Sequence, residues 1–202
     1  EFYTENYGKI VGVIFGSTSK KIKSYLLIGN KFHINSKIRE DGRLSYLKVE
    51  IDEIKTPVYL ENKKKLFCII YCMNLIKIIT AENENNIEIY NLLEKLFKII
   101  ELDNWLVEFL YLELNILKSI GYDINFKDYV VDKNINGKTK YIVDASQKII
   151  PNFLINKKIV PENLKDIYKG FSIVGDFLDK TIIKPNNKNY PSSRNDFVNL
   201  LK

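Results

Sequence analysis

The spacing of apolar residues changes near residue 64, and this change limits the folds open to the chain. Before it, short β-branched and aromatic runs alternate with turn residues; the runs are Lys9–Gly16, Ser24–Ile28, Lys31–Ile38 and Leu44–Ile54. Such runs predict strands of a small antiparallel sheet or barrel, and Asp41-Gly42 predicts a tight hairpin turn. After it, apolar residues recur every three or four positions, which predicts helices. We therefore expect an α+β chain.

The helical part is predicted to begin with a three-helix bundle. Apolar faces recur over about 64–80, 87–100 and 105–120, and short polar links join them. Helices with such faces pack around one shared core. The sequence therefore predicts two domains, residues 1–62 and 63–202.

The period breaks again at about 122–150, inside the second domain. Tyr129–Val131 and Lys140–Val143 flank turn residues there and predict an inserted β-hairpin. A further helix is predicted over Pro161–Ile183. Ser192 or Ser193 is expected to cap a last one.

The positive charge is concentrated in the strand-rich third. The chain has 31 Lys and Arg against 25 Asp and Glu, a net charge of +6, and residues 1–66 account for +5 of it with 13 basic and 8 acidic side chains. A basic domain favours a polyanion such as nucleic acid. Lysines that neutralise phosphates, with rings that stack on bases, are how small barrels hold single strands. The candidate DNA-binding residues are Lys20, Lys21, Lys23, Tyr25, Lys31, Phe32, Arg39 and Arg43.

Two readings of these residues stay open at this stage. A lysine-rich chain exposes lysines on every solvated face, and barrels of this kind also bind proteins and sugars. The residues alone do not choose between a nucleic-acid surface and an ordinary solvated one.

No enzyme or metal signature accompanies the basic residues. Two Cys and one His exclude a zinc ribbon or a multi-His site, and Cys68 and Cys72 are predicted to be core residues. His33 is predicted to be a surface or half-buried strand residue. Gly137-Lys138-Thr139 is predicted to be a hairpin turn, because the earlier glycine of a phosphate-binding loop is missing. Glu113 is conspicuous because it interrupts an apolar stretch, yet helical acids are usually solvated. We expect no catalytic residue and no cofactor.

The ends of the chain and its apolar runs bear on location. The longest apolar run, 66–79, is shorter than the ~20 residues of a membrane-spanning helix. The first residues do not resemble a signal peptide. A cytoplasmic protein with no membrane partner is expected, and because Met73 is the sole methionine, a processed or truncated product is expected too.

Several short motifs follow one another in a fixed order. They are Thr4–Lys9 with Gly16–Lys21, Leu27–Asn30 with Arg39, Trp105 and Leu112–Leu114 with Leu117 and Ile120–Tyr122, Tyr141–Asp144, and Tyr190–Arg194. Together these motifs resemble the RecO family of bacterial recombination mediators, in its alphaproteobacterial form. The resemblance extends over nearly the whole chain.

The resemblance implies an oligonucleotide-binding (OB) barrel, here lacking its first strand, followed by a helical domain. It implies binding of single- and double-stranded DNA, strand annealing, and cooperation with RecR and the tail of the single-strand binding protein in loading RecA at the nucleoid. Many members hold zinc through two Cys pairs near the hairpin. Tyr129, Asp132 and Ser146–Ile150 provide none, so no zinc site is expected.

One alternative function belongs to a different class. The helical domain could bind an acidic, apolar-ended peptide while the barrel serves only as a scaffold with little DNA affinity. Separate titrations of DNA and of such a peptide distinguish the two.

Overall fold

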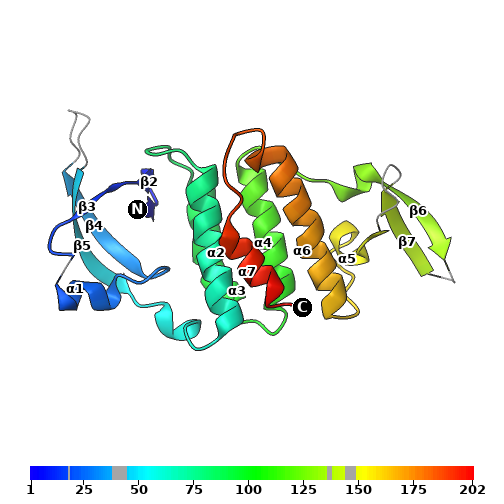
Figure 1. Cartoon of the computed structure of the whole chain (residues 1–202), viewed down its shortest axis with the longest axis horizontal. Helices are drawn as coiled ribbons and strands as arrows, with labels where there is room; N and C mark the ends of the chain where they lie inside the picture. Colours follow the sequence, from blue (N-terminus) through cyan, green and yellow to red (C-terminus); the bar gives the residue numbers. More distant parts are fainter. Residues whose placement is uncertain (18, 38–44, 136–137, 144–148) are drawn as a thin grey trace. The chain divides into compact units, whose positions relative to one another are not determined.

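The chain forms two compact units, residues 1–102 and 103–202, in which helices and small sheets are combined (Figure 1). The computed structural model describes residues 1–17, 19–37, 45–135, 138–143 and 149–202. The predicted α+β class is confirmed. The predicted domain boundary between residues 62 and 63 remains a prediction.

Two small sheets form the strand region of the first unit. Its strands are β1 (Phe2–Thr4), β2 (Gly8–Ile10), β3 (Gly12–Ile14), β4 (Lys31–Lys37) and β5 (Ser45–Glu53). β1 and β2 form an antiparallel hairpin, while β5 lies at the centre of a second sheet between β3 and β4. β4 pairs with β5 in antiparallel fashion, but β3 runs parallel to β5. The two predicted strands that correspond to β4 and β5 are thus confirmed, whereas the sheet is mixed rather than antiparallel.

Two expectations for this region differ from the structure. Ser24–Ile28 is not a strand, because Lys20–Tyr25 forms helix α1 and 26–30 is irregular. The Ser19 side chain begins α1 by accepting a hydrogen bond from the backbone amide of Ile22 at 3.3 Å, and such a cap stabilises a short helix that weak local propensity does not specify. Among the described residues no sheet closes into a barrel, so the OB barrel is not confirmed. Asp41-Gly42 lies outside the described residues.

The first unit also contains two of the predicted helices. A 3₁₀ turn, η1 (Thr56–Val58), leads to α2 (Lys63–Ile79), and α3 (Ile87–Ile99) follows. The Asn62 side chain caps α2 by accepting a hydrogen bond from the Lys65 amide at 3.2 Å, and the Asn86 side chain caps α3 by accepting one from the Ile89 amide at 3.1 Å. Cys68 and Cys72 are fully buried in α2, as predicted for core residues.

The second unit combines several helices with one small sheet. Its elements are α4 (Trp105–Ser119), η2 (Phe126–Tyr129), β6 (Val130–Ile135), β7 (Lys138–Val143), β8 (Ile149–Ile150), α5 (Asn152–Ile155), α6 (Leu164–Leu178), the π-helical turn η3 (Asp179–Ile183) and α7 (Ser192–Asn199). The predicted hairpin is confirmed as β6 and β7, and β8 extends it to three strands. Within the described residues, no helix of the chain is long and apolar enough to cross a membrane.

The ends of the last two helices were predicted less well. α6 begins after Asn163, whose side chain accepts from the Asp166 amide at 3.1 Å, rather than at Pro161. Neither predicted serine caps α7, because Pro191 holds the cap position and Ser192 is already helical. Ser193 is instead buried.

Helices α4, α6 and α7 join through three aromatic rings and one ion pair. The rings of Phe109, Phe171 and Phe197 lie 5.3 to 6.1 Å apart between centroids. Beside them Arg194, 3% exposed, meets Glu113, 0% exposed. Of the three helices that the sequence predicts as one bundle, α2 and α3 lie in the first unit and α4 in the second.

The Arg194 guanidinium uses each of its nitrogens. Its Nε donates to Glu113 Oε1 at 3.1 Å, and Nη2 donates to Glu113 Oε2 at 3.4 Å and to the Phe171 carbonyl at 2.7 Å. Nη1 donates to the Tyr190 hydroxyl at 3.1 Å. Burial raises the pKa of Tyr190, so this phenol stays neutral. Glu113 is thus a structural residue, bound by an arginine from the C-terminal motif.

Candidate nucleic-acid interface

Two of the predicted DNA-binding lysines lie exposed on α1. Lys20 and Lys23 are three residues apart, a spacing that places side chains on one side of a helix. Helix α1 also includes Lys21, whose side chain is outside the described residues, as are Arg39 and Arg43. The described part of this surface is therefore a short basic helix.

The two predicted stacking rings contact each other. Phe32, from β4, lies 5.5 Å from the ring of Phe2 in an edge-to-face arrangement and 6.1 Å from the ring of Tyr25. Both Phe32 and Tyr25 are half-buried. The structure thus brings them together in a cluster that packs the end of α1 on the sheet.

Lys31 is turned toward α3 of the same unit. Its Nζ lies 3.1 Å from Glu94 Oε1 and 5.8 Å from the centre of the Tyr90 ring. The hydrogen bond to Glu94 raises the pKa of Lys31, so the side chain stays protonated. A phosphate would compete with Glu94 for this ammonium group.

His33 lies on the exposed face of β4, as the sequence predicts. Its side chain is 74% exposed, and its Nε2 lies 3.1 Å from Asp52 Oδ1 on β5. Nothing in this arrangement resembles a nucleophile beside a base.

Sequence reasoning did not single out the most exposed ring of the unit. Phe15, directly after β3, is 83% exposed, and Tyr46 on β5 is 54% exposed. The alternation of Val13 and Phe15 is a sequence signal that places both on one face, but it does not say which face is exposed.

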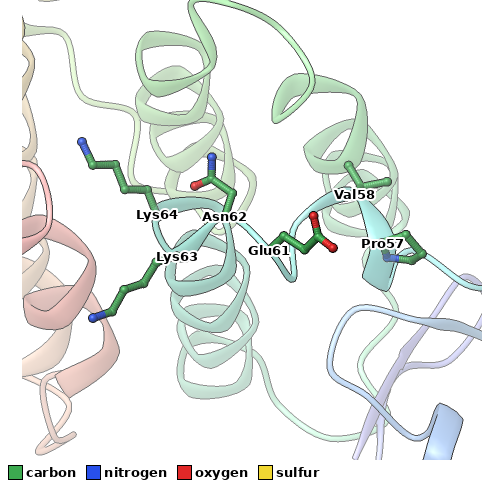
Figure 2. A pocket seen from close by; sticks show the side chains of 6 residues that line it. All are labelled: Pro57, Val58, Glu61, Asn62, Lys63 and Lys64. Carbon is green, nitrogen blue, oxygen red and sulfur yellow. The ribbon is translucent and has the colours of Figure 1, made fainter.

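A hollow lies at the start of α2 (Figure 2). It is lined by Pro57, Val58, Glu61, Asn62, Lys63 and Lys64. In Figure 2 the two lysine side chains extend away from Pro57 and Val58, and the Asn62 side chain caps α2. Over the described ranges no three His, Cys, Asp or Glu side chains are grouped to hold a metal ion.

Beside exposed carboxylates such as that of Glu50, the first unit exposes the ammonium groups of Lys20 and Lys23 and the rings of Phe15 and Tyr46. Ammonium groups and aromatic rings are the groups that hold nucleic acids by charge neutralisation and stacking.

Comparison with known proteins identifies the family. The family model described as Recombination protein O C terminal matches residues 60–162, just over half of the chain. The chain is 25% identical to the DNA repair protein RecO of Ehrlichia chaffeensis, over 84% of this chain and 71% of that protein. It is 21% identical to the protein of that name from Rhodopseudomonas palustris (strain TIE-1), over 100% and 87%, and 22% identical to that from Wolbachia pipientis wMel, over 98% and 90%. No solved structure is significantly similar.

The chain therefore belongs to the RecO family. This is a family of DNA-repair mediators, not of enzymes, and the resemblance seen in the short motifs is confirmed.

Proposed function

We propose that the chain mediates DNA repair and homologous recombination by binding single- and double-stranded DNA, promoting strand annealing and helping RecR to load the RecA recombinase. Membership of the RecO family supports the repair role. The exposed basic helix α1, in the part of the chain that carries most of the net charge, is the observation that supports DNA binding. We place this activity in the bacterial cytoplasm, at the nucleoid.

The mechanism requires no covalent chemistry. Ammonium groups that neutralise phosphates on two complementary strands reduce their mutual repulsion and raise their local concentration, so annealing accelerates. We propose that Lys20, Lys21, Lys23, Lys31, Arg39 and Arg43 supply this charge and that Tyr25 or Phe32 stacks on the bases. Of these lysines, Lys20 and Lys23 are exposed on α1. The strands β3, β4 and β5 are proposed to be the open remainder of an OB-like barrel.

Charge reversal on α1 tests DNA binding. We expect Lys20→Glu/Lys23→Glu to weaken binding of a labelled single strand at least roughly tenfold at low salt, and to lower the slope of log affinity against log salt by about 2, because two phosphate contacts are lost. Fluorescence anisotropy at several salt concentrations measures both quantities. An unchanged affinity and slope would remove α1 from the interface.

The matched control lies in the second unit. Lys157 and Lys158 are exposed, and reversing them changes the net charge by the same amount. We expect Lys157→Glu/Lys158→Glu to keep single-strand affinity within roughly twofold, because these lysines belong to the second unit and not to the proposed DNA-binding residues. An equal loss in both variants would show that only overall charge matters.

A second candidate function has an observation of its own. Next to Lys157 and Lys158, Ile159 is 37% exposed, Val160 80% and Leu164 41%. Apolar side chains beside lysines fit an acidic, apolar-ended peptide such as the tail of the single-strand binding protein. Reversal of Lys157 and Lys158 is expected to abolish binding of a peptide of that composition, while the α1 variant retains it. If the unmodified chain binds the peptide but no DNA at low salt, the peptide-binding function replaces the first proposal.

A further inference from the structure

The exposed face of the β3–β5–β4 sheet carries different chemistry at its two ends. Residues paired in register share a face of a sheet. The register pairs Val13 with Tyr46 at one end and His33 with Glu50 toward the other. The first end is apolar and aromatic, and the second is lined by carboxylates.

The aromatic end carries two rings that border one hollow. Phe15 follows Val13 by two residues, and its backbone amide donates to the Leu47 carbonyl at 3.3 Å, which holds it beside β5. Phe15 and Tyr46 border one hollow of about 400 Å³, together with Asn35 and Lys48. Leu47, which points to the opposite face, is 1% exposed. The core therefore lies behind the sheet, and the two rings face outward.

Two exposed rings around one hollow need an explanation. Isolated apolar side chains on a surface are ordinary, but aromatic rings around one hollow forgo the stabilisation that burial would supply and mark a binding surface. The Tyr25 and Phe32 rings of the same unit are half-buried. Phe15 and Tyr46 are therefore more exposed than the two rings that the sequence predicts to stack on bases.

The surrounding side chains indicate what the rings bind. Asn35 and Lys48, which are paired in register on the face of Tyr46, bring an amide and an ammonium group to the hollow. Its other described lining residues are Ser36 and Leu47, and none of the described lining residues is a carboxylate. Lys48 lies 3.1 Å from Glu50, but the side chains are 73% and 61% exposed. Such exposed pairs are weak and are screened by salt, so a phosphate can take the place of Glu50.

We propose that Phe15 and Tyr46 form a stacking platform for the bases of single-stranded DNA, with Lys48 contacting the backbone. This inference rests on the proposed DNA binding and specifies how the chain distinguishes single-stranded from double-stranded DNA. The bases of a duplex are already stacked on one another, whereas an open strand presents its faces to aromatic side chains. The platform therefore favours single strands, while the lysines of α1 bind either form.

The acidic end limits the path of the strand. Glu50 and Asp52 lie on the same face as Tyr46, further along β5, and Asp52 is paired with His33. Phosphates are repelled there, so the DNA crosses the sheet at its aromatic end and does not follow β5. With two rings, the platform holds about two bases.

Removing one ring at a time tests the platform. We expect Phe15→Leu and Tyr46→Leu each to weaken binding of a single strand roughly tenfold, because each removes one stacked base. Binding of a duplex and of an abasic strand of equal length should stay within about twofold, because phosphate contacts remain. Tyr46→Phe, which keeps the ring, is expected to retain full affinity. Anisotropy with the full chain and the three labelled DNAs measures these changes, and circular dichroism checks the fold.

Two further variants complete the test, one as a control and one with the opposite expected effect. Leu60, 52% exposed elsewhere in the unit, is an apolar side chain without a ring, and Leu60→Ala should leave all three affinities unchanged. Glu50→Gln should raise single-strand affinity, because it frees Lys48 and removes a negative charge.

Each outcome supports or overturns one statement. If the unmodified chain binds single strands and the leucine variants bind equally well, the platform is wrong and the proposed DNA binding stands. If the variants lose duplex and single-strand affinity alike, stacking is wrong. If they lose only an acidic peptide, the face binds protein instead. If the unmodified chain binds no DNA, both proposals fail.

Discussion

Replacing Arg194 by methionine is expected to lower the free energy of unfolding by about 3–5 kcal/mol, the largest single-residue effect we predict. The substitution leaves the Glu113 carboxylate fully buried without its countercharge, and it removes the donors to the Phe171 carbonyl and the Tyr190 hydroxyl. A buried charge without a partner is far more costly than the intact pair is stabilising. Denaturant unfolding followed by far-UV circular dichroism measures the loss.

The double variant distinguishes the pair from its surroundings. Glu113→Leu/Arg194→Met removes both charges, so we expect it to recover most of the lost stability and to unfold within about 1–2 kcal/mol of the unmodified chain. Lys118→Ala is the matched control on α4, because Lys118 forms an ion pair with Asp123 at 2.7 Å with both side chains exposed. That variant should cost less than about 1 kcal/mol. A double variant no more stable than Arg194→Met would show that packing, and not the unpaired charge, sets the loss.

The same pair shows what sequence patterns detect in this fold. Glu113 is conspicuous because it interrupts an apolar stretch of α4, but helical acids are usually solvated, so the sequence did not predict its burial. Its partner lies 81 residues further along the chain, and no helical or strand period relates such distant positions. Both residues belong to segments that resemble RecO motifs, and in this chain the ion pair joins the two segments.

Local structure was predictable where the helical spacing of apolar residues continued over many residues. The helices α2, α3 and α4 have 17, 13 and 15 residues with a repeated apolar face, and all three were predicted. Helix α1 has six residues, too few to show a period, and its serine cap outweighs the strand propensity of its neighbours. The mixed sheet was missed because pairing between β3 and β5 depends on contacts distant in sequence.

The candidate interface was predictable in its charge but not in its rings. Lysines are usually solvated, so the exposure of Lys20 and Lys23 follows from their type. An aromatic ring is exposed or buried according to which sheet face the rest of the unit covers. Alternation separates Phe32 from His33, and Phe15 from Ile14, but only the strand order places Phe15 outside and Phe32 against Phe2.

The N-terminal motif, Thr4–Lys9, forms the turn between β1 and β2, and its glycine is the site of the second large effect on stability that we predict. Thr4 Oγ1 donates to the Gly8 carbonyl at 3.0 Å and accepts from the Tyr7 amide at 3.2 Å, which closes the β1–β2 turn. Gly8 has φ +64°, and a Cβ built there would lie 1.8 Å from the Glu84 carbonyl oxygen. The glycine thus lets the hairpin lie directly against the loop between α2 and α3.

We expect Gly8→Ala to lower the free energy of unfolding by roughly 2–5 kcal/mol, because left-handed strain and a backbone overlap add together. Gly16→Ala separates the two causes. Gly16 has φ +73°, but its Cβ would meet only the Ile22 side chain at 3.5 Å, an ordinary contact. The control should therefore lose only the roughly 1–2 kcal/mol of left-handed strain. Thermal unfolding of both variants measures the difference, and equal losses would contradict a close approach of Gly8 to Glu84. The excess loss at Gly8 over Gly16 is the free-energy cost of the overlap between the new Cβ and the Glu84 carbonyl. It therefore reports on the close contact between the β1–β2 hairpin and the loop that joins α2 and α3.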